Sequence, residues 1–290
     1  QMPGFGFKRV DAIVQKSGSN QHDPMRIQGA VLYGLEKARD SGGHLYMEAT
    51  ALLKSALSLL NENVTTSAMQ VIPQEVENQL EKMILANVVA SNKGNIYLPH
   101  LYLQESETAC LIVQKMMEKV EVPSYLTSVV ERVKGQLGIT LSKRQYEGVM
   151  NAFSHNLTII TGGPGTGKST ILRAVIETFR ILNPDGIICL GAPTGKASRR
   201  MTETTGIENA QTLHSLLNLH GDESVWQKKP VFLNADLLVV DESSMMDMFL
   251  AHQLFTRVRP HTRILMVGDA DQLESVGPGD VLHQLIKSEL

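Results

Sequence analysis

A candidate phosphate-binding loop lies near the middle of the chain. Residues 162–169 read Gly-Gly-Pro-Gly-Thr-Gly-Lys-Ser and directly follow the apolar run 157–161, as a loop leaving a buried strand should. The glycines let successive backbone N–H groups curl around phosphate oxygens, and a helix that begins where the loop ends points its positive dipole at the same anion. The pattern predicts a site for a nucleoside triphosphate.

The loop gives its side chains distinct roles. We expect Lys168 to reach the β- and γ-phosphates and Ser169 to hold Mg²⁺. The other expected nucleotide contacts are Gly163, Pro164, Gly165, Thr166, Gly167 and Thr170. The alternative is a chance glycine-rich turn. It is disfavoured because a strand precedes the eight fixed positions and an amphipathic run follows them.

Two adjacent carboxylates form the second element of the candidate site. Asp241 and Glu242 end the apolar, β-branched run 237–240, which is typical of a parallel strand whose carboxyl end opens onto a ligand crevice. We expect Asp241 to bind Mg²⁺ and Glu242 to act as the general base on the attacking water. Both can serve one site only where the strand ends and the backbone turns. An ordinary acidic helix start is the weaker alternative.

The chain has to position these groups on a sheet and its helices. Ser243 and Ser244 would end the strand and cap a helix over 245–258. We predict an α/β P-loop NTPase domain, a parallel sheet with flanking helices, preceded by an all-α region. In that region, apolar residues at steps of three and four predict helices at 25–39, 47–61, 72–91 and 105–119, with a short β element at 95–103.

Three more motifs accompany the loop and the acidic pair. They are Ala-Pro-Thr-Gly-Lys-Ala at 192–197, Thr-Leu-His-Ser-Leu-Leu at 212–217 and Val-Gly-Asp-Ala-Asp-Gln-Leu at 267–273. Together the motifs resemble those of superfamily 1 helicases. More narrowly, they resemble the RecD-like branch of superfamily 1B in its long form, the exodeoxyribonuclease V α-subunit family. The resemblance is strong from residue 141 onward and looser before it.

The resemblance implies a RecA-like fold for the P-loop domain and further roles at the nucleotide. Gln145 matches a glutamine that reads the adenine edge, and Tyr146 is a weaker candidate for stacking on the base. Gln272 matches the residue that senses the γ-phosphate, so the expected catalytic set is Lys168, Asp241, Glu242 and Gln272.

The resemblance also implies a DNA-binding face. The matching positions are Pro193, Thr194, Lys196, Thr212 and His214. A small β-hairpin subdomain is expected near 218–234, with Lys228 and Lys229 facing DNA beside Trp226. A solvated lysine pair on an exposed loop is the open alternative.

The implied activity is ATP-dependent, 5′-to-3′ DNA unwinding with ATP and Mg²⁺ as cofactors. The expected partner is DNA, either single-stranded or duplex with a 5′ single-stranded tail, together with unidentified recombination or repair proteins. Two alternatives remain open. The first is the helicase portion of a conjugative relaxase, which a catalytic tyrosine with a histidine cluster would mark. The second is a non-enzymatic DNA-binding module, whose DNA binding would survive loss of Lys168.

The expected domain organisation has three parts. A helix-hairpin-helix-like region covers 1–65, a small helical subdomain with the β element covers 66–135, and the RecA-like domain covers 136–290. The run 3–13 resembles the second half of a helix-hairpin-helix, although a turn used only for packing is an equal alternative. Related helicases close the nucleotide site with arginines from a second RecA-like domain. We find no such domain, and therefore expect a fragment, truncated at both ends, with weak or no activity alone.

Composition limits the class of protein. The chain has 290 residues, 42% hydrophobic and 20% charged, with a net charge of −3, so no strong basic excess is visible. Cys110 and Cys189 are too few and too far apart for a metal site or a disulfide framework. Without a membrane-length apolar run or a signal peptide, the expected location is the cytoplasm, with no membrane contact.

Overall fold

The computed structural model describes residues 6–16, 18, 20–62, 64, 66, 69–219, 230–272, 275 and 277–288. The chain divides into two compact units. Unit 1 comprises Gln1–Glu105 with Gly277–Gly279, and unit 2 comprises Ser106–Val276 with Asp280–Leu290. The finer division into three parts stays a prediction.

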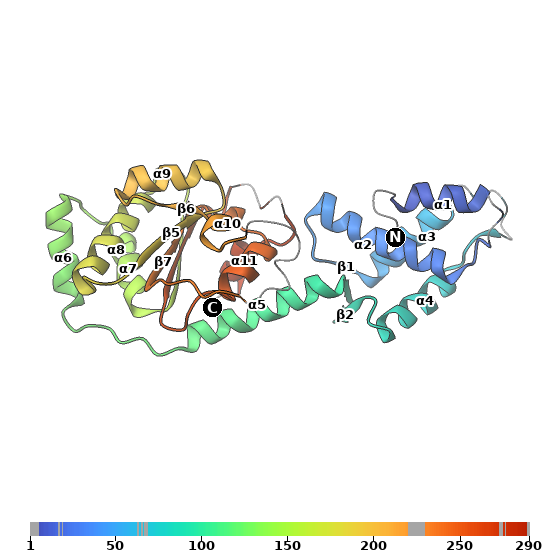
Figure 1. Cartoon of the computed structure of the whole chain (residues 1–290), viewed down its shortest axis with the longest axis horizontal. Coiled ribbons are helices and arrows are strands. Elements are labelled where there is room, and N and C mark those ends of the chain that lie inside the picture. The colour runs from blue at the N-terminus through green and yellow to red at the C-terminus, as the bar shows by residue number, and fades with distance from the viewer. Residues whose placement is uncertain are drawn as a thin grey trace. The chain divides into compact units, whose positions relative to one another are not determined.

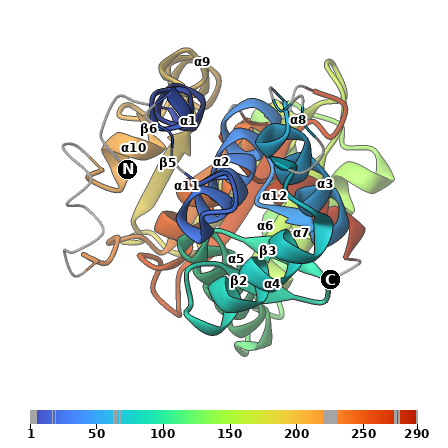
Figure 2. The ribbon, with the colours of Figure 1, turned by 90° about the vertical axis from the view of Figure 1, so that its right-hand side faces the viewer.

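Unit 1 combines helices with a small antiparallel sheet, whose strand order is β1-β3-β2. Its helices are α1 (Phe7–Lys16), α2 (Pro24–Gly42), α3 (Ala49–Leu60) and α4 (Pro73–Leu85), and its strands are β1 (Tyr46–Glu48), β2 (Ala90–Asn92) and β3 (Asn95–Tyr97). Figure 2 labels two of these strands, β2 and β3, together with the helices α1 to α4. The β element is shorter than predicted because α5 (Pro99–Met117) already begins at Pro99. Proline suits a first helical turn, where a backbone N–H has no partner to lose.

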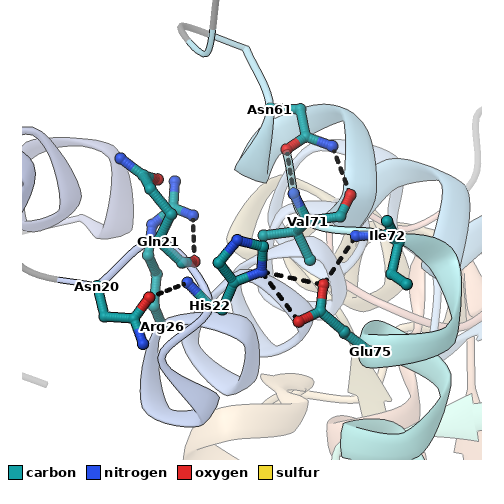
Figure 3. Close-up of polar contacts among 8 residues, drawn as sticks. All are labelled: Asn20, Gln21, His22, Arg26, Asn61, Val71, Ile72 and Glu75. Atoms are coloured by element: carbon teal, nitrogen blue, oxygen red, sulfur yellow. Dashed lines mark hydrogen bonds and ion pairs between the residues drawn. The ribbon is translucent and has the colours of Figure 1, made fainter. Parts of the chain in front are cut away.

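Polar contacts join three segments of unit 1 (Figure 3). His22 Nδ1 lies 2.9 Å from Glu75 Oε1, and Glu75 Oε2 accepts a 2.9 Å hydrogen bond from Ile72 N at the start of α4. At the end of α3, the amide of Asn61 both donates to Val71 O and accepts from Val71 N, each over 2.9 Å. The first contact ties the segment before α2 to the start of α4, and the second closes the loop between α3 and α4. Buried residues of α2, α3 and α4 belong to one core.

Unit 2 contains a five-stranded parallel sheet in the order β4-β8-β7-β5-β6 among its described residues. The strands are β4 (Leu157–Thr161), β5 (Ile188–Ala192), β6 (Gln211–Thr212), β7 (Leu237–Val240) and β8 (Arg263–Gly268). The helices are α6 (Leu126–Leu137), α7 (Lys143–Ser154), α8 (Lys168–Leu182), α9 (Gly195–Thr205), α10 (Leu213–Leu216), η3 (Ser243–Met245), α11 (Met248–Phe255) and α12 (Val281–Lys287). The predicted α/β fold class is confirmed.

Helices cover both faces of this sheet, with α7 and α8 on one side and α11 on the other (Figure 1). Strand β7 is buried along its whole length. Residues on both faces of a central parallel strand meet helices, which explains its unbroken apolar sequence. The sheet therefore holds the carboxyl ends of β4, β7 and β8 together at one edge, where loops can form a site.

The helix predicted at 245–258 starts later than expected. A short 3₁₀ turn, η3, follows β7, and α11 begins only at Met248. Its cap is Asp247, whose side chain accepts a 2.8 Å hydrogen bond from Leu250 N. Ser243 does not cap this helix, because its hydroxyl donates instead to Val267 O over 2.9 Å. That bond joins the ends of β7 and β8.

The described helices give no membrane span, since none of them is sufficiently long and apolar to cross a bilayer.

Candidate nucleotide site and nucleic-acid interface

The loop between β4 and α8 has the geometry of a phosphate-binding loop. Gly165 and Gly167 have φ angles of 75° and 90°, which lie in the left-handed region that favours glycine. Gly167 is the residue that precedes the first turn of α8. The free N–H groups at the start of α8 therefore open onto the loop, as phosphate binding requires.

Lys168 lies inside the loop that it is expected to serve. Its Nζ donates to the carbonyl oxygen of Gly162 and, over 3.3 Å, to that of Gly163. It also lies 3.9 Å from Oδ2 of Asp269, whose side chain is 2% exposed. Asp269 is a neighbour of Lys168 that the sequence did not lead us to assign. Its position in the 267–273 motif was visible, but its pairing with Lys168 depends on the parallel neighbours β4 and β8.

The two adjacent carboxylates reach one site because the backbone turns at Glu242. Its φ of 51° and ψ of 39° are left-handed, which is uncommon for a residue with a side chain. Asp241 accepts a 2.9 Å hydrogen bond from Glu242 N, which holds the turn. Strain of this kind is often found where a side chain must be aimed at a ligand.

Burial makes both carboxyl groups harder to ionise. Desolvation raises the pKa of Asp241, against the hydrogen bond from Glu242 N and the charges of Lys168 and Arg200. Desolvation and the neighbouring Asp241 raise the pKa of Glu242, against the same two cations. A raised pKa makes a carboxylate a better proton acceptor, as a general base should be.

One cavity of about 320 Å³ brings most of the predicted residues together. Its lining includes Gly163, Pro164, Gly165, Thr166, Gly167, Lys168, Ser169, Asp241, Glu242 and Gln272. Of the predicted nucleotide contacts, Gln145 and Thr170 are not among its lining residues. Loop, acidic pair and Gln272 thus face one space, although they come from three separate segments.

The donor set of the cavity fits a hard divalent cation. Ser169 supplies a hydroxyl oxygen and Asp241 a carboxylate, and such oxygen ligands suit Mg²⁺. The bond from Glu242 N takes one lone pair of Asp241, and an ionised carboxylate has about four acceptor sites. Enough lone pairs remain for a metal ion.

Gln145 occupies the junction between α7 and the loop. Its Oε1 accepts from Ser142 N over 2.9 Å, and its Nε2 donates to Thr166 O over 2.9 Å. The glutamine therefore caps α7 and ties that helix to the phosphate-binding loop. Adenine reading by Gln145 stays a prediction.

Helix α9 supplies cavity residues that the sequence reasoning did not assign. Arg200, Met201 and Thr204 line the cavity together with the loop. No local motif marks them, because their approach to the loop depends on how α9 packs against α8.

The predicted DNA-binding residues lie at the ends of two neighbouring strands. Ala192 of β5 pairs with Thr212 of β6, so the segments that follow these strands leave the sheet side by side. Thr194 caps α9 by accepting from Ala197 N over 3.3 Å, and Thr212 caps α10 by accepting from Ser215 N over 3.2 Å. Lys196 and His214 are exposed, and Pro193 is partly buried.

Lys228, Lys229 and Trp226 lie outside the described residues, as does most of the expected hairpin at 218–234. On its far side, Val231 and Phe232 are exposed. The hairpin and its lysines stay predictions.

Two family models match the chain. The description "AAA domain" applies to residues 145–278, and "ATP-dependent RecD2 DNA helicase HHH domain" applies to residues 1–46. The first match spans the loop, the acidic pair and Gln272.

Two curated relatives illustrate the similarity. The ATP-dependent RecD2 DNA helicase of Deinococcus radiodurans is 32% identical over 283 residues, which cover 96% of this chain and 39% of the relative. The RecBCD enzyme subunit RecD of Mycolicibacterium smegmatis is 39% identical over 158 residues, covering 47% of this chain and 28% of the relative. The chain thus spans well under half the length of either relative.

Solved structures also match. The crystal structure of Pif1 helicase from Candida albicans is 26% identical with a TM-score of 0.36, covering 47% of this chain and 34% of that one.

Proposed function

Because the chain belongs to the RecD-like superfamily 1 helicases with an N-terminal helix-hairpin-helix region, we propose that it carries the first motor domain of an ATP-dependent DNA helicase. The observation that carries this proposal is the single cavity shared by Lys168, Asp241, Glu242 and Gln272. A binding module without turnover has no need for a strained, desolvated carboxylate beside a phosphate-binding loop.

The phosphate-binding loop and the acidic pair have separate tasks when ATP is bound. The N–H groups of the loop and Lys168 neutralise the phosphates, which requires Lys168 to exchange its carbonyl partners for phosphate oxygens. Ser169 and Asp241 would hold Mg²⁺, which would supply positive charge to the phosphates. Glu242 orients a water in line with the terminal phosphate and accepts its proton.

Gln272 is placed to report on the nucleotide. Its backbone N–H donates to Asp269 O over 3.3 Å, and its side chain lines the cavity. Asp269 in turn faces Lys168. We infer that Gln272 contacts the γ-phosphate and that this contact ends on hydrolysis.

Single-stranded DNA is the proposed track. The strand ends that carry Thr194 and Thr212 form a polar edge, and exposed Lys196 adds a cation for the phosphate backbone. Helix α9 begins at this edge and passes the nucleotide cavity at Arg200, so one rigid element contacts both proposed ligands. Movement with 5′-to-3′ polarity is part of the proposal.

A strand-separation assay tests this function in the protein that contains this chain. Forked DNA with a 5′ single-stranded tail, ATP and Mg²⁺ should yield separated strands, whereas the Glu242→Gln variant should bind the fork and leave it paired. DNA binding without ATP hydrolysis or strand separation in the wild type would contradict the proposal and support a non-enzymatic module.

A further inference from the structure

Helix α9 turns one side toward the nucleotide cavity. Arg200, Met201 and Thr204 line it, and the spacing of Arg200 and Thr204 places them on one face of the helix. The phosphate-binding loop and the carboxylates Asp241 and Glu242 line the same cavity. Arg200 therefore brings a permanent positive charge to the cavity where hydrolysis is proposed.

Arg200 is unlike the other cation of the cavity. Lys168 is engaged by two carbonyl oxygens and by Asp269. Arg200 is exposed, and within the described residues it makes no hydrogen bond or ion pair. Its five N–H donors are thus available to a ligand.

The nucleotide site holds more acidic than basic side chains if Arg200 is left out. Three carboxyl groups, those of Asp241, Glu242 and Asp269, lie with one cation, Lys168, and a triphosphate adds further negative charge. Arg200 lines the same cavity as Asp241, Glu242 and the phosphate-binding loop, so a phosphate bound there would lie within electrostatic reach of its charge.

We propose that Arg200 contacts the terminal phosphate of the bound nucleoside triphosphate, as a cation supplied by the motor domain itself. This inference rests on the proposed function. Arg200 lines the cavity together with Lys168, Glu242 and Gln272, and it comes from α9, whereas Lys168 begins α8. A planar guanidinium matches the paired oxygens of a phosphate and can hold them through two parallel hydrogen bonds.

The competing role for Arg200 is to hold the carboxylate of Glu242 in place without touching the nucleotide. The two roles differ in what they do to binding. A terminal-phosphate contact stabilises a bound triphosphate and not a diphosphate, whereas a contact to Glu242 alone affects turnover and leaves both affinities unchanged.

The test measures the affinity of the 290-residue chain for a non-hydrolysable ATP analogue and for ADP, each with Mg²⁺. Arg200→Ala should weaken analogue binding by about tenfold or more and change ADP binding by less than about twofold, because a hydrogen bond to a charged group is lost only with the triphosphate. Arg200→Lys should restore part of the loss. Arg199→Ala is the matched control, because Arg199 is the exposed neighbour of Arg200 on α9 and does not line the cavity.

A second arm repeats Arg200→Ala in a Glu242→Gln background. If Arg200 binds phosphate, the loss of analogue affinity persists when Glu242 has no charge. Disappearance of the loss in this background, an equal loss for both nucleotides, or no loss at all would overturn the inference. Lys168→Ala tests the proposed nucleotide site separately, since it should weaken the binding of both the ATP analogue and ADP. If it weakens the binding of neither, the assignment of the nucleotide site is wrong.

Discussion

The side-chain Nε2 of Gln145 donates a 2.9 Å hydrogen bond to the carbonyl oxygen of Thr166, and so joins the first turn of α7 to the phosphate-binding loop. Its Oε1 accepts from Ser142 N at the same time. A primary amide has two donors and two acceptor lone pairs, so one of each remains. The free acceptor lone pair can accept from the amino group of adenine, and the free N–H can donate to a ring nitrogen on the same edge.

Replacing Gln145 by Glu should separate its two roles. A glutamate still accepts from Ser142 N and completes the helix cap, but it loses the hydrogen bond to Thr166 O, so the melting temperature should fall only modestly. Both donors are lost, so ATP should bind about tenfold or more weakly and its advantage over GTP should disappear. Competition binding with the two nucleotides measures this. Preserved preference for ATP in Gln145→Glu would show that adenine is read elsewhere.

Ser142→Ala is the matched control for that variant. Its hydroxyl accepts from Gln145 N over 3.3 Å, so its loss should cost about 0.5–2 kcal/mol of stability. The ATP preference should remain.

Salt dependence should distinguish DNA contacts from solvated charges. If Lys196, Lys228 and Lys229 meet phosphates, each change to Ala should reduce the log–log salt slope of single-stranded DNA binding by about 0.7, because one counterion release is lost. Thr212→Ala and His214→Ala should alter it less, since a hydroxyl and a neutral imidazole release no counterion. Titrations at several salt concentrations measure the slopes, with the Glu131-paired Lys134→Ala as control. An unchanged slope for a lysine variant would remove that residue from the interface.

Gly268→Ala should destabilise unit 2. An added Cβ would lie 2.7 Å from both Leu282 Cδ2 and Ser243 Oγ, and 3.2 Å from Ser244 N. Relieving these contacts requires shifting the ends of β7 and β8, at an expected cost of about 1–3 kcal/mol. Urea unfolding measures the change. The control is Gly135→Ala in α6, where an added Cβ would have no atom within 4 Å apart from its chain neighbours and its own helix backbone, so the substitution should be neutral or stabilising. Equal stability of the two variants would contradict the packing described for Gly268.

Lys115 should stabilise the contact between α5 and the segment after α11. Its Nζ donates to the carbonyl oxygens of Pro260 and, over 3.2 Å, Arg259. Lys115→Met leaves both carbonyls without this donor and should cost about 1–3 kcal/mol, whereas the exposed Lys119→Met should cost little. A melting temperature unchanged by Lys115→Met would contradict this role.

The same variant has a defined pH dependence. Burial lowers the pKa of Lys115 below 10.5, so the unfolded chain holds its proton to higher pH than the folded one. Wild-type stability therefore gains from rising pH between the lowered pKa and 10.5, and the gap to Lys115→Met should widen over that interval. A gap that narrows would show that the charged form is favoured by folding.

The sequence predicted the parts of the site that local patterns encode. Gly165, Gly167 and Lys168 need a particular turn before a helix, and Asp241 and Glu242 need the end of a buried strand, so their types and spacing reveal them. The start of α11 was missed because serine and aspartate both cap helices. Asp247 caps α11 because the hydroxyl of Ser243 is already bonded to Val267 O.

Other parts of the site depend on packing between distant segments. Asp269 meets Lys168 because β8 lies beside β4, and Arg200 reaches the cavity because α9 packs on α8. The spacing of residues along the sequence does not predict which of these segments become neighbours. The second hydrogen bond of Gln145, to Thr166 O, is of the same kind.

A calorimetric titration of ATP with Mg²⁺ into the wild type, Lys168→Ala and Glu242→Gln tests the nucleotide site directly. Lys168→Ala should bind at least about tenfold more weakly, since a charge-assisted contact to the phosphates is lost. Glu242→Gln should bind like the wild type, because Gln keeps the shape and removes only the base. Equal loss of binding in both variants would contradict the roles assigned to Lys168 and Glu242.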